Sequence, residues 1–363
     1  MFEASRLEEA LTLTADGFRS LKGINDAPSE LDGDGSIHFD EWDWEVGVGL
    51  YGFYKHACKT GDERMKRNLA SWYDMQIARG LPPRQINSTA PMLCLALLAR
   101  ETNNERWKQI VTDWAEWLVN DMPKTVDEGF QHLVKEREND GQLWDDTLFM
   151  AGLFMGVAGD WLDRPDWVEE AYYQFLVHGR YLSDPVSGLW YHGWTFLGNH
   201  NYAEAFWARG NAWITIAVPE LFELVGERYG PAARQIKALY RRQVEALLPL
   251  QLEDGMWPTL LDQPDSPPET SATAGFAYGL LRGVRTGILP ESYLQPALKA
   301  ASAVLERIDA AGIVQEVSDG TAMGHDFEFY RNIPNTPTPY GQALASLLLI
   351  ELLAAKEILQ DVA

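Results

Sequence analysis

The fold is decided by a stretch that is apolar or small on every side, Val46-Gly47-Val48-Gly49-Leu50-Tyr51-Gly52. A helix without a polar face has to be buried all round. Two further stretches have the same character, Ala90-Pro91-Met92-Leu93-Cys94 and Thr273-Ala274-Gly275-Phe276-Ala277-Tyr278-Gly279. Because glycine and alanine leave room for a neighbouring backbone, such helices can approach one another closely. We therefore expect them to form the inside of the molecule.

Apolar residues recur at helical spacing along almost the whole chain, which predicts about twelve helices in six pairs. We expect them near residues 4–21, 43–58, 62–79, 88–101, 104–120, 146–159, 164–181, 204–225, 229–250, 269–286, 291–309 and 337–358. The first helix of a pair carries charges on one face, as in 62–67, which is typical of a solvated outer helix. Long connections lead into the second, apolar helix of each pair, at 22–42, 80–87, 121–145, 182–203, 251–268 and 310–336.

This regularity predicts one all-α domain over residues 1–363, an (α/α)6 barrel of six helical hairpins. An open solenoid is the alternative, but the first and last pairs lack the polar faces of terminal caps. In a closed barrel the inner helices run parallel, so their N-termini and the long loops share one face. Helix N-termini favour anionic groups, and we expect the chemistry at that face.

Composition narrows the range of partners. The formal net charge is -23 and no Lys/Arg-rich block occurs, which argues against nucleic acid and anionic membrane surfaces. The apolar runs are too short for a membrane span, and the N-terminus does not resemble a signal peptide, so a cytoplasmic protein is expected. Cys58 and Cys94 lie in apolar runs and are expected to be buried thiols, not a disulfide. Zinc-type Cys/His spacing is not found, and we expect no cofactor or metal.

The strongest candidate for a catalytic site is Trp144-Asp145-Asp146-Thr147-Leu148-Phe149-Met150-Ala151-Gly152. One aspartate before an apolar helix is explained by N-capping. A second carboxyl beside a Trp suggests an acid catalyst, because apolar surroundings raise the pKa of a carboxyl group.

Other aromatic and polar residues gather at the starts of the inner helices. We predict that the substrate-binding residues are Trp42, Trp44, Asn87, Trp144, His192, Trp207, Arg209 and Trp213. Several of them have a structural alternative: Trp42 and Trp44 plug the barrel mouth, Asn87 caps a helix, His192 is a structural hydrogen-bonding group, and Arg209 pairs with Glu204 or Asp146. Taken together, aromatic walls, carboxylates and an arginine indicate a sugar site, with the arginine suited to a uronate carboxylate.

The motifs 144–152, His192-Gly193-Trp194, Trp207-Ala208-Arg209-Gly210-Asn211 and Glu269-Thr270-Ser271-Ala272 together resemble glycoside hydrolase family 105, the unsaturated rhamnogalacturonyl hydrolases. The resemblance spans about Trp44 to Glu351. It implies an (α/α)6 barrel and a metal-free hydrolase with a role in pectin degradation. Such an enzyme removes a 4,5-unsaturated uronic acid from the non-reducing end of lyase-generated oligosaccharides by hydrating the enol-ether double bond. The resemblance also implies that Asp146, directly before Thr147-Leu148-Phe149-Met150, is the proton donor.

Several alternatives stay open. The related unsaturated glucuronyl hydrolases of family 88 have an aspartate where this chain has Asn87, which favours family 105. An ordinary inverting glycosidase would use two acids and an activated water. A non-catalytic helical protein that binds acidic sugars is a third reading. Sugar epimerases share the barrel, but we would expect more pocket histidines in them than His192 and His325.

Overall fold

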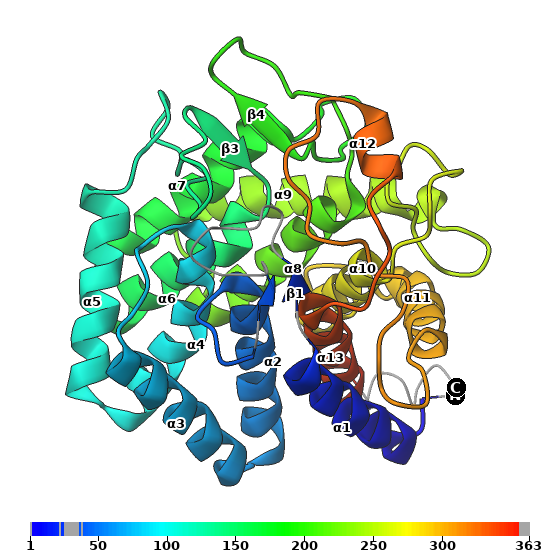
Figure 1. Ribbon diagram of the computed structural model, residues 1–363. Helices are drawn as coiled ribbons and strands as arrows, with labels where there is room; N and C mark the ends of the chain where they lie inside the picture. The colour runs from blue at the N-terminus through cyan, green and yellow to red at the C-terminus, as the bar shows by residue number, and fades with distance from the viewer. Residues whose placement is uncertain (1, 22, 25–35, 38, 356–363) are drawn as a thin grey trace.

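A computed structural model describes residues 2–21, 23, 24, 36, 37 and 39–355. Within these residues six long helices form an inner ring: α2 (Trp44–Thr60), α4 (Ile86–Thr102), α6 (Leu153–Trp161), α8 (Ala208–Val225), α10 (Thr270–Arg285) and α13 (Pro339–Ala354). A π-helical turn, η1 (Leu148–Gly152), leads directly into α6. Each inner helix contacts the next, and α13 contacts α2, so the ring is closed (Figure 1). Closure confirms the predicted (α/α)6 barrel and excludes the open solenoid.

The outer helices in the described part of the chain are α1 (Ala4–Ser20), α3 (Glu63–Arg79), α5 (Glu105–Asn120), α7 (Pro165–Leu182), α9 (Gly230–Leu247) and α11 (Leu294–Glu306). Each buries one stripe, as α5 does with Trp107, Val111, Trp114 and Leu118 at a spacing of three to four residues. Every predicted helix is therefore present. Among their starts the largest differences are at α6, which begins at Leu153 after the π-helical turn and not at residue 146, and at α8, which begins at Ala208 and not at residue 204.

Glycine allows the inner helices to pack backbone against backbone. A Cβ atom on Gly47 of α2 would lie 2.6 Å from the backbone nitrogen of Pro91 in α4. A Cβ atom on Gly279 of α10 would collide with the carbonyl oxygen of Thr215 in α8. A side chain at either position would push two inner helices apart, so the small residues predicted to allow close approach do so.

The long connections contain short elements that the sequence pattern did not predict. Two antiparallel pairs occur, β1 (Gly23–Ile24) with β2 (Ser36–Ile37) and β3 (Gln142–Trp144) with β4 (Gly193–Thr195). A short helix, α12 (Phe327–Arg331), lies in the connection 310–336. The 3-10 turns η2 (Leu248–Leu250) and η3 (Glu291–Tyr293) lie at the end of the predicted helix 229–250 and at the start of the predicted helix 291–309. Strands of two or three residues are too short to show an alternating pattern. The pairing of Trp144 with Gly193 matters most, because it joins two long loops over the barrel mouth.

The cysteine prediction is half correct. Both thiols are free and Cys94 is buried, as expected. Cys58 is exposed, so its predicted burial is wrong. It lies in the last turn of α2, where its Sγ atom is 3.7 Å from Oε1 of Glu101. Among the described helices, none has the length and apolar character needed to cross a membrane.

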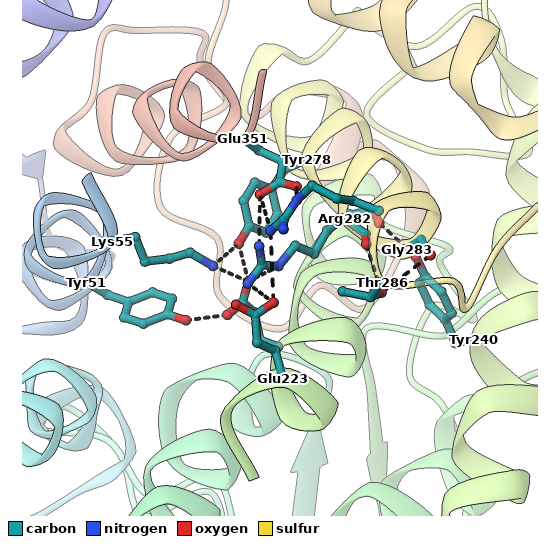
Figure 2. Close-up of polar contacts among 12 residues, drawn as sticks. Tyr51, Lys55, Glu223, Tyr240, Tyr278, Arg282, Gly283, Thr286 and Glu351 are labelled. Atoms are coloured by element: carbon teal, nitrogen blue, oxygen red, sulfur yellow. Dashed lines mark hydrogen bonds and ion pairs between the residues drawn. The ribbon is translucent and has the colours of Figure 1, made fainter. Parts of the chain in front are cut away.

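The ring is held away from the long loops by a buried polar cluster to which four inner helices contribute (Figure 2). Glu220 of α8 accepts hydrogen bonds from the hydroxyls of Tyr51 and Tyr278. The same carboxylate lies 2.5 Å from Lys55 Nζ and 3.3 Å from Arg282 Nε. We call this the far-end cluster: Tyr51, Lys55, Glu220, Tyr278, Arg282 and Glu351.

Candidate active site

A pocket lies at the face where the inner helices begin and the long loops cross. Its hollow is about 650 Å³, including the open solvent at the mouth. It is lined by Trp44, Asn87, His132, Val134, Glu136, Arg137, Asn139, Trp144, Asp146, Trp207, Arg209, Trp213, Thr321 and Ala322. Seven of the nine predicted site residues are among these; Trp42 and His192 are the two that are not.

Trp42 lies behind the pocket wall and not in it. Its ring stacks on Trp72, with centroids 5.7 Å apart at 23°, and its Nε1–H donates to the carbonyl oxygen of Ser88 at 2.7 Å. This contact joins the segment before α2 to the first turn of α4. The geometry is that of the structural alternative, an aromatic plug in the barrel mouth.

His192 is buried directly before β4. Its Nδ1 lies 2.8 Å from the hydroxyl of Tyr330, and its ring packs on Trp207 and Trp144 with centroids 4.4 and 5.1 Å apart. Burial lowers the pKa of His192 to about 3, and the charge of Arg209 acts in the same direction. His192 is therefore neutral, and it holds two of the pocket tryptophans in place from behind.

Asp146 reaches the pocket from the junction between β3 and the π-helical turn. Its side chain is 18% exposed, and its backbone carbonyl accepts the N–H groups of Phe149 and Met150, both at 3.0 Å. Turns of π-helix often occur at functional sites. After Asp146 the chain passes through Thr147 and the π-helical turn into α6, so the carboxyl group stands before the start of this inner helix, at the pocket wall.

Asp145, its neighbour, is placed differently. It is fully buried and does not line the pocket. A Cβ atom on Gly210 would collide with the Asp145 carboxyl group, so that group lies against the backbone of α8. Burial, and next the charge of Asp146, raise the pKa of Asp145 well above its usual value. The two adjacent carboxyl groups therefore have different environments: that of Asp146 faces the pocket, and that of Asp145 is buried in the protein interior.

His132 is a site residue that the sequence did not identify. It comes from the long loop 121–145, and its ring stacks on Trp144 with centroids 4.1 Å apart at an angle of 6°. Its Nδ1 is 2.9 Å from Thr147 Oγ1 and 3.3 Å from Asp146 Oδ1. Burial, followed by the charges of His192 and His178, lowers the pKa of His132 well below its usual value, so the ring is neutral. No motif around His132 marks it, since the fold alone brings it to Asp146.

Arg209 lies at the start of α8 with its guanidinium between two rings, 4.6 Å from the centroid of Trp207 and 4.7 Å from that of Tyr340. Its Nη1 donates to the carbonyl and hydroxyl oxygens of Ser318, at 2.7 and 2.5 Å. Its Nη2 donates to the carbonyl of Asp319 at 2.8 Å and to Thr321 Oγ1 at 3.0 Å. The predicted partners Glu204 and Asp146 are not among these contacts. Arg209 therefore clamps the loop 318–321 against the barrel, and mainly its edge remains for a ligand.

Aromatic rings form the inner walls of the pocket. Trp44 stacks on Tyr340 with centroids 4.9 Å apart at 27°, and Trp213 meets Trp44 edge-on at 6.1 Å. Such rigid apolar faces suit the C–H faces of a sugar ring. At the mouth the exposed side chains of Glu136 and Arg137 come from the loop 121–145. The sequence pattern did not predict which residues of this loop reach the pocket. Among the described residues no group of three or more His, Cys, Asp or Glu side chains is placed to hold a metal ion.

Comparisons with known proteins find two related families of glycoside hydrolases, 88 and 105. The family model of Glycosyl Hydrolase Family 88 matches residues 29–356. The chain is 34% identical over 319 residues to the unsaturated rhamnogalacturonyl hydrolase YesR of Bacillus subtilis, covering 87% of this chain and 91% of that protein. Crystal structures of possible members of family 105 superpose closely. That from Salmonella enterica serovar Paratyphi A has a TM-score of 0.91 at 41% identity, over 96% of this chain and 94% of its own. That from Klebsiella pneumoniae has a TM-score of 0.93 at 39% identity, over 98% and 94%.

Proposed function

The chain belongs to glycoside hydrolase family 105, a relative of family 88, and on this basis we propose that it removes a 4,5-unsaturated uronic acid from the non-reducing end of lyase-generated oligosaccharides. The preferred substrate is an unsaturated rhamnogalacturonan disaccharide, the type of substrate named for the Bacillus subtilis relative. Asp146 is the proton donor of this reaction.

The chemistry is hydration of an enol ether. The carboxyl group of Asp146 gives its proton to C4, and the positive charge that develops at C5 is shared with the ring oxygen. Water adds to C5 and returns a proton to the Asp146 carboxylate. The resulting hemiketal opens and the aglycone leaves. One carboxyl group serves both proton steps, so a second carboxyl at glycosidase spacing is not needed.

The observation that carries the proposal is the unequal placement of Asp145 and Asp146. A retaining or inverting glycosidase needs two carboxyl groups facing the scissile bond. Here Asp145 is buried against α8, and Asp146 faces the pocket. The exposed Glu136 at the mouth belongs to a surface loop and not to the Trp-walled interior. This arrangement suits one acid acting on a double bond.

The anionic group of the substrate calls for a cation. Arg209 and Arg137 both line the pocket, but the terminal nitrogens of Arg209 are bound to Ser318, Asp319 and Thr321. We assign the uronate carboxylate to the edge of Arg209 together with the exposed guanidinium of Arg137. The rings of Trp44 and Trp213 then contact the faces of the sugar.

The proposal is tested by ultraviolet absorbance. The unsaturated uronate absorbs through its conjugated enol-ether acid, so hydration removes the signal. We expect turnover of the unsaturated rhamnogalacturonan disaccharide, and a loss of about 10²- to 10⁴-fold or more in kcat for Asp146→Asn, the range for removing a general acid. Glu138→Gln is the matched control, because Glu138 is an exposed acid in the same part of the chain that does not line the pocket.

Other outcomes separate the alternatives. Turnover of glucuronyl substrates in preference to the rhamnogalacturonan disaccharide would assign a family 88-like activity. Turnover of saturated oligosaccharides, with no loss of absorbance, would assign ordinary hydrolysis. Binding without turnover of any unsaturated substrate would leave a sugar-binding protein and contradict the proposal.

A further inference from the structure

His132 is fixed at the pocket wall by more contacts than a loop side chain needs for packing. Its backbone N–H donates to Gln142 O at 3.0 Å, and its carbonyl accepts from Asn139 Nδ2 at 2.8 Å. The ring is only 2% exposed and lies flat on Trp144. Backbone and ring are thus both held, and one ring nitrogen is directed at the group that performs the proposed reaction.

That nitrogen, Nδ1, faces two oxygens, Thr147 Oγ1 at 2.9 Å and Asp146 Oδ1 at 3.3 Å. A neutral imidazole has one N–H and one lone pair, and its partners decide which nitrogen carries the proton. A lone pair on Nδ1 would face the Asp146 oxygen with like partial charge. The Thr147 hydroxyl can pair with either form, because it donates as well as accepts. Only an N–H on Nδ1 suits the Asp146 oxygen, so the contact with Asp146 favours the proton on Nδ1.

We propose that His132 is a positioning residue for Asp146, with a neutral ring whose Nδ1–H is directed at Asp146 Oδ1. This inference rests on the proposed function. The bond occupies Oδ1, so the acid proton lies on Oδ2, the other oxygen. It also holds the carboxyl group in one rotamer. The atom that donates to C4 is in this way fixed before substrate binds.

The same bond contributes to the rate. When Asp146 gives its proton to C4 it becomes a carboxylate, and a hydrogen bond to a charged acceptor is stronger than one to a neutral acceptor. The Nδ1–H···Oδ1 interaction therefore strengthens on the way to the transition state. Only interactions of that kind raise kcat.

Two substitutions separate the effect of the Nδ1–H group from the effect of the ring stacked on Trp144. His132→Phe keeps a flat ring on Trp144 and removes Nδ1–H. His132→Asn keeps an amide donor close to the position of Nδ1 and removes the stack. We expect His132→Phe to lose about 10- to 100-fold in kcat, the effect of one hydrogen bond to a charged group, with little change in KM. We expect His132→Asn to retain more of the wild-type kcat than His132→Phe.

The pH profile gives a readout that a purely structural role would not move. Activity requires the acid form of Asp146, so kcat falls at high pH. Removing a donor that stabilises the carboxylate lets Asp146 stay protonated up to a higher pH. In the profile of kcat against pH, the alkaline limb of His132→Phe should move to higher pH, and that of His132→Asn should stay near that of the wild type.

Other charged and titratable groups face this part of the site and have to be separated from Asp146. They are Asp145 before the π-helical turn, His178 of α7, His192 before β4, Arg209 of α8, and Glu136 and Arg137 of the loop. Burial lowers the pKa of His178 to about 4 and that of His192 to about 3, so neither titrates near neutral pH. Asp145 is tested with Asp145→Asn, which should leave the alkaline limb in place.

A second measurement does not depend on turnover. Nitrogen-15 NMR of the imidazole should show His132 neutral at pH 7 with its proton on Nδ1. A proton on Nε2 overturns the inference whether or not the enzyme is active. Wild-type activity is measured first: a wild type without turnover contradicts the proposed function and leaves the NMR result to decide on His132. With an active wild type, an unshifted limb in His132→Phe, or His132→Phe more active than His132→Asn, overturns the positioning role alone.

Discussion

Arg209 and Arg137 are two pocket cations whose environments assign them different tasks. Arg209 has four polar contacts to 318–321 and two ring contacts, so Arg209→Ala should lower the free energy of unfolding by about 2–4 kcal/mol through lost hydrogen bonds and a cavity. It should also lower kcat/KM, because loop 318–321 supports the pocket wall. Urea unfolding and steady-state kinetics measure both effects.

Arg137→Gln is the matched comparison. Arg137 is exposed at the mouth, so its loss should change the free energy of unfolding by less than about 0.5 kcal/mol. We expect KM for the unsaturated uronide to rise about tenfold with kcat nearly unchanged, as for a contact made equally in the ground and transition states. An unchanged KM in Arg137→Gln, with a raised KM in a stably folded Arg209→Ala, would return carboxylate recognition to Arg209 alone.

At the residue scale, the sequence identifies the site residues that stand at the start of a predicted helix and misses those that stand in long loops. Asp146 and the tryptophans stand at helix starts, and a barrel brings helix starts together, so pattern and topology were enough to predict that they share a pocket. His132, Arg137 and Thr321 stand in long loops, whose path depends on tertiary contacts such as the pairing of Trp144 with Gly193. Trp42 is the opposite case: it was predicted from its position before a helix to line the pocket, but its ring packs on Trp72.

At the scale of elements, the far-end cluster joins α2, α8, α10 and α13 through Glu220 and Glu351. Burial alone would raise the pKa of Glu220, but Lys55 and Arg282 lower it to about 2. Glu220→Gln would leave both cations buried without their shared carboxylate. We expect a loss of about 3–5 kcal/mol in the free energy of unfolding at pH 7, the cost of breaking a buried ion pair from one side.

The pH dependence has a defined sign. The folded pKa of Glu220 lies below its unfolded value of about 4.3. Its contribution is therefore complete above that value and is lost as the pH falls toward 2. The difference between wild type and Glu220→Gln, measured by urea unfolding at pH 7, 5, 4 and 3, should shrink only at the lowest values. Glu223→Gln is the control, because Glu223 is 42% exposed and should cost about 1 kcal/mol or less. Equal losses for both variants would contradict a special role for the buried cluster.

Helices were predictable because each contains several turns of a repeated pattern, and that signal survives errors of a few residues at the ends. The β3–β4 pair and α12 have no such repetition. The π-helical turn is equally hidden, since a single extra residue before α6 does not change the apolar pattern of 148–161. These unpredicted elements all lie in or beside the long loops, and the β3–β4 pair and the π-helical turn shape the pocket directly.

At the scale of the whole molecule, ring closure divides the barrel into two ends with different tasks. The far-end cluster joins four of the six inner helices, and long loops cover the N-terminal ends. Function is thereby placed on segments that can vary in sequence while the ring below them stays closed. The same division explains why the family was readable from helix-start motifs, while the sugar that follows the uronide depends on loop side chains.

The whole-molecule charge gives the last prediction. The chain carries a formal net charge of -23, and the proposed substrate is an anion. Arg137 is an exposed cation of the pocket, but Glu136 stands beside it, so the long-range field at the mouth should repel the substrate. Salt screens this repulsion over about 10 Å at 0.1 M. We expect kcat/KM to rise about two- to threefold between 0.01 and 0.15 M ionic strength.

The methyl ester of the unsaturated uronate separates this effect from any change in the protein. It keeps the enol ether and removes the charge, so its kcat/KM should be nearly independent of salt. If kcat/KM for the acid falls with salt while that of the ester stays constant, the field at the mouth attracts the substrate. The local cations Arg137 and Arg209 would then outweigh the acidic surface, and Arg137→Gln should reverse the sign of the salt dependence.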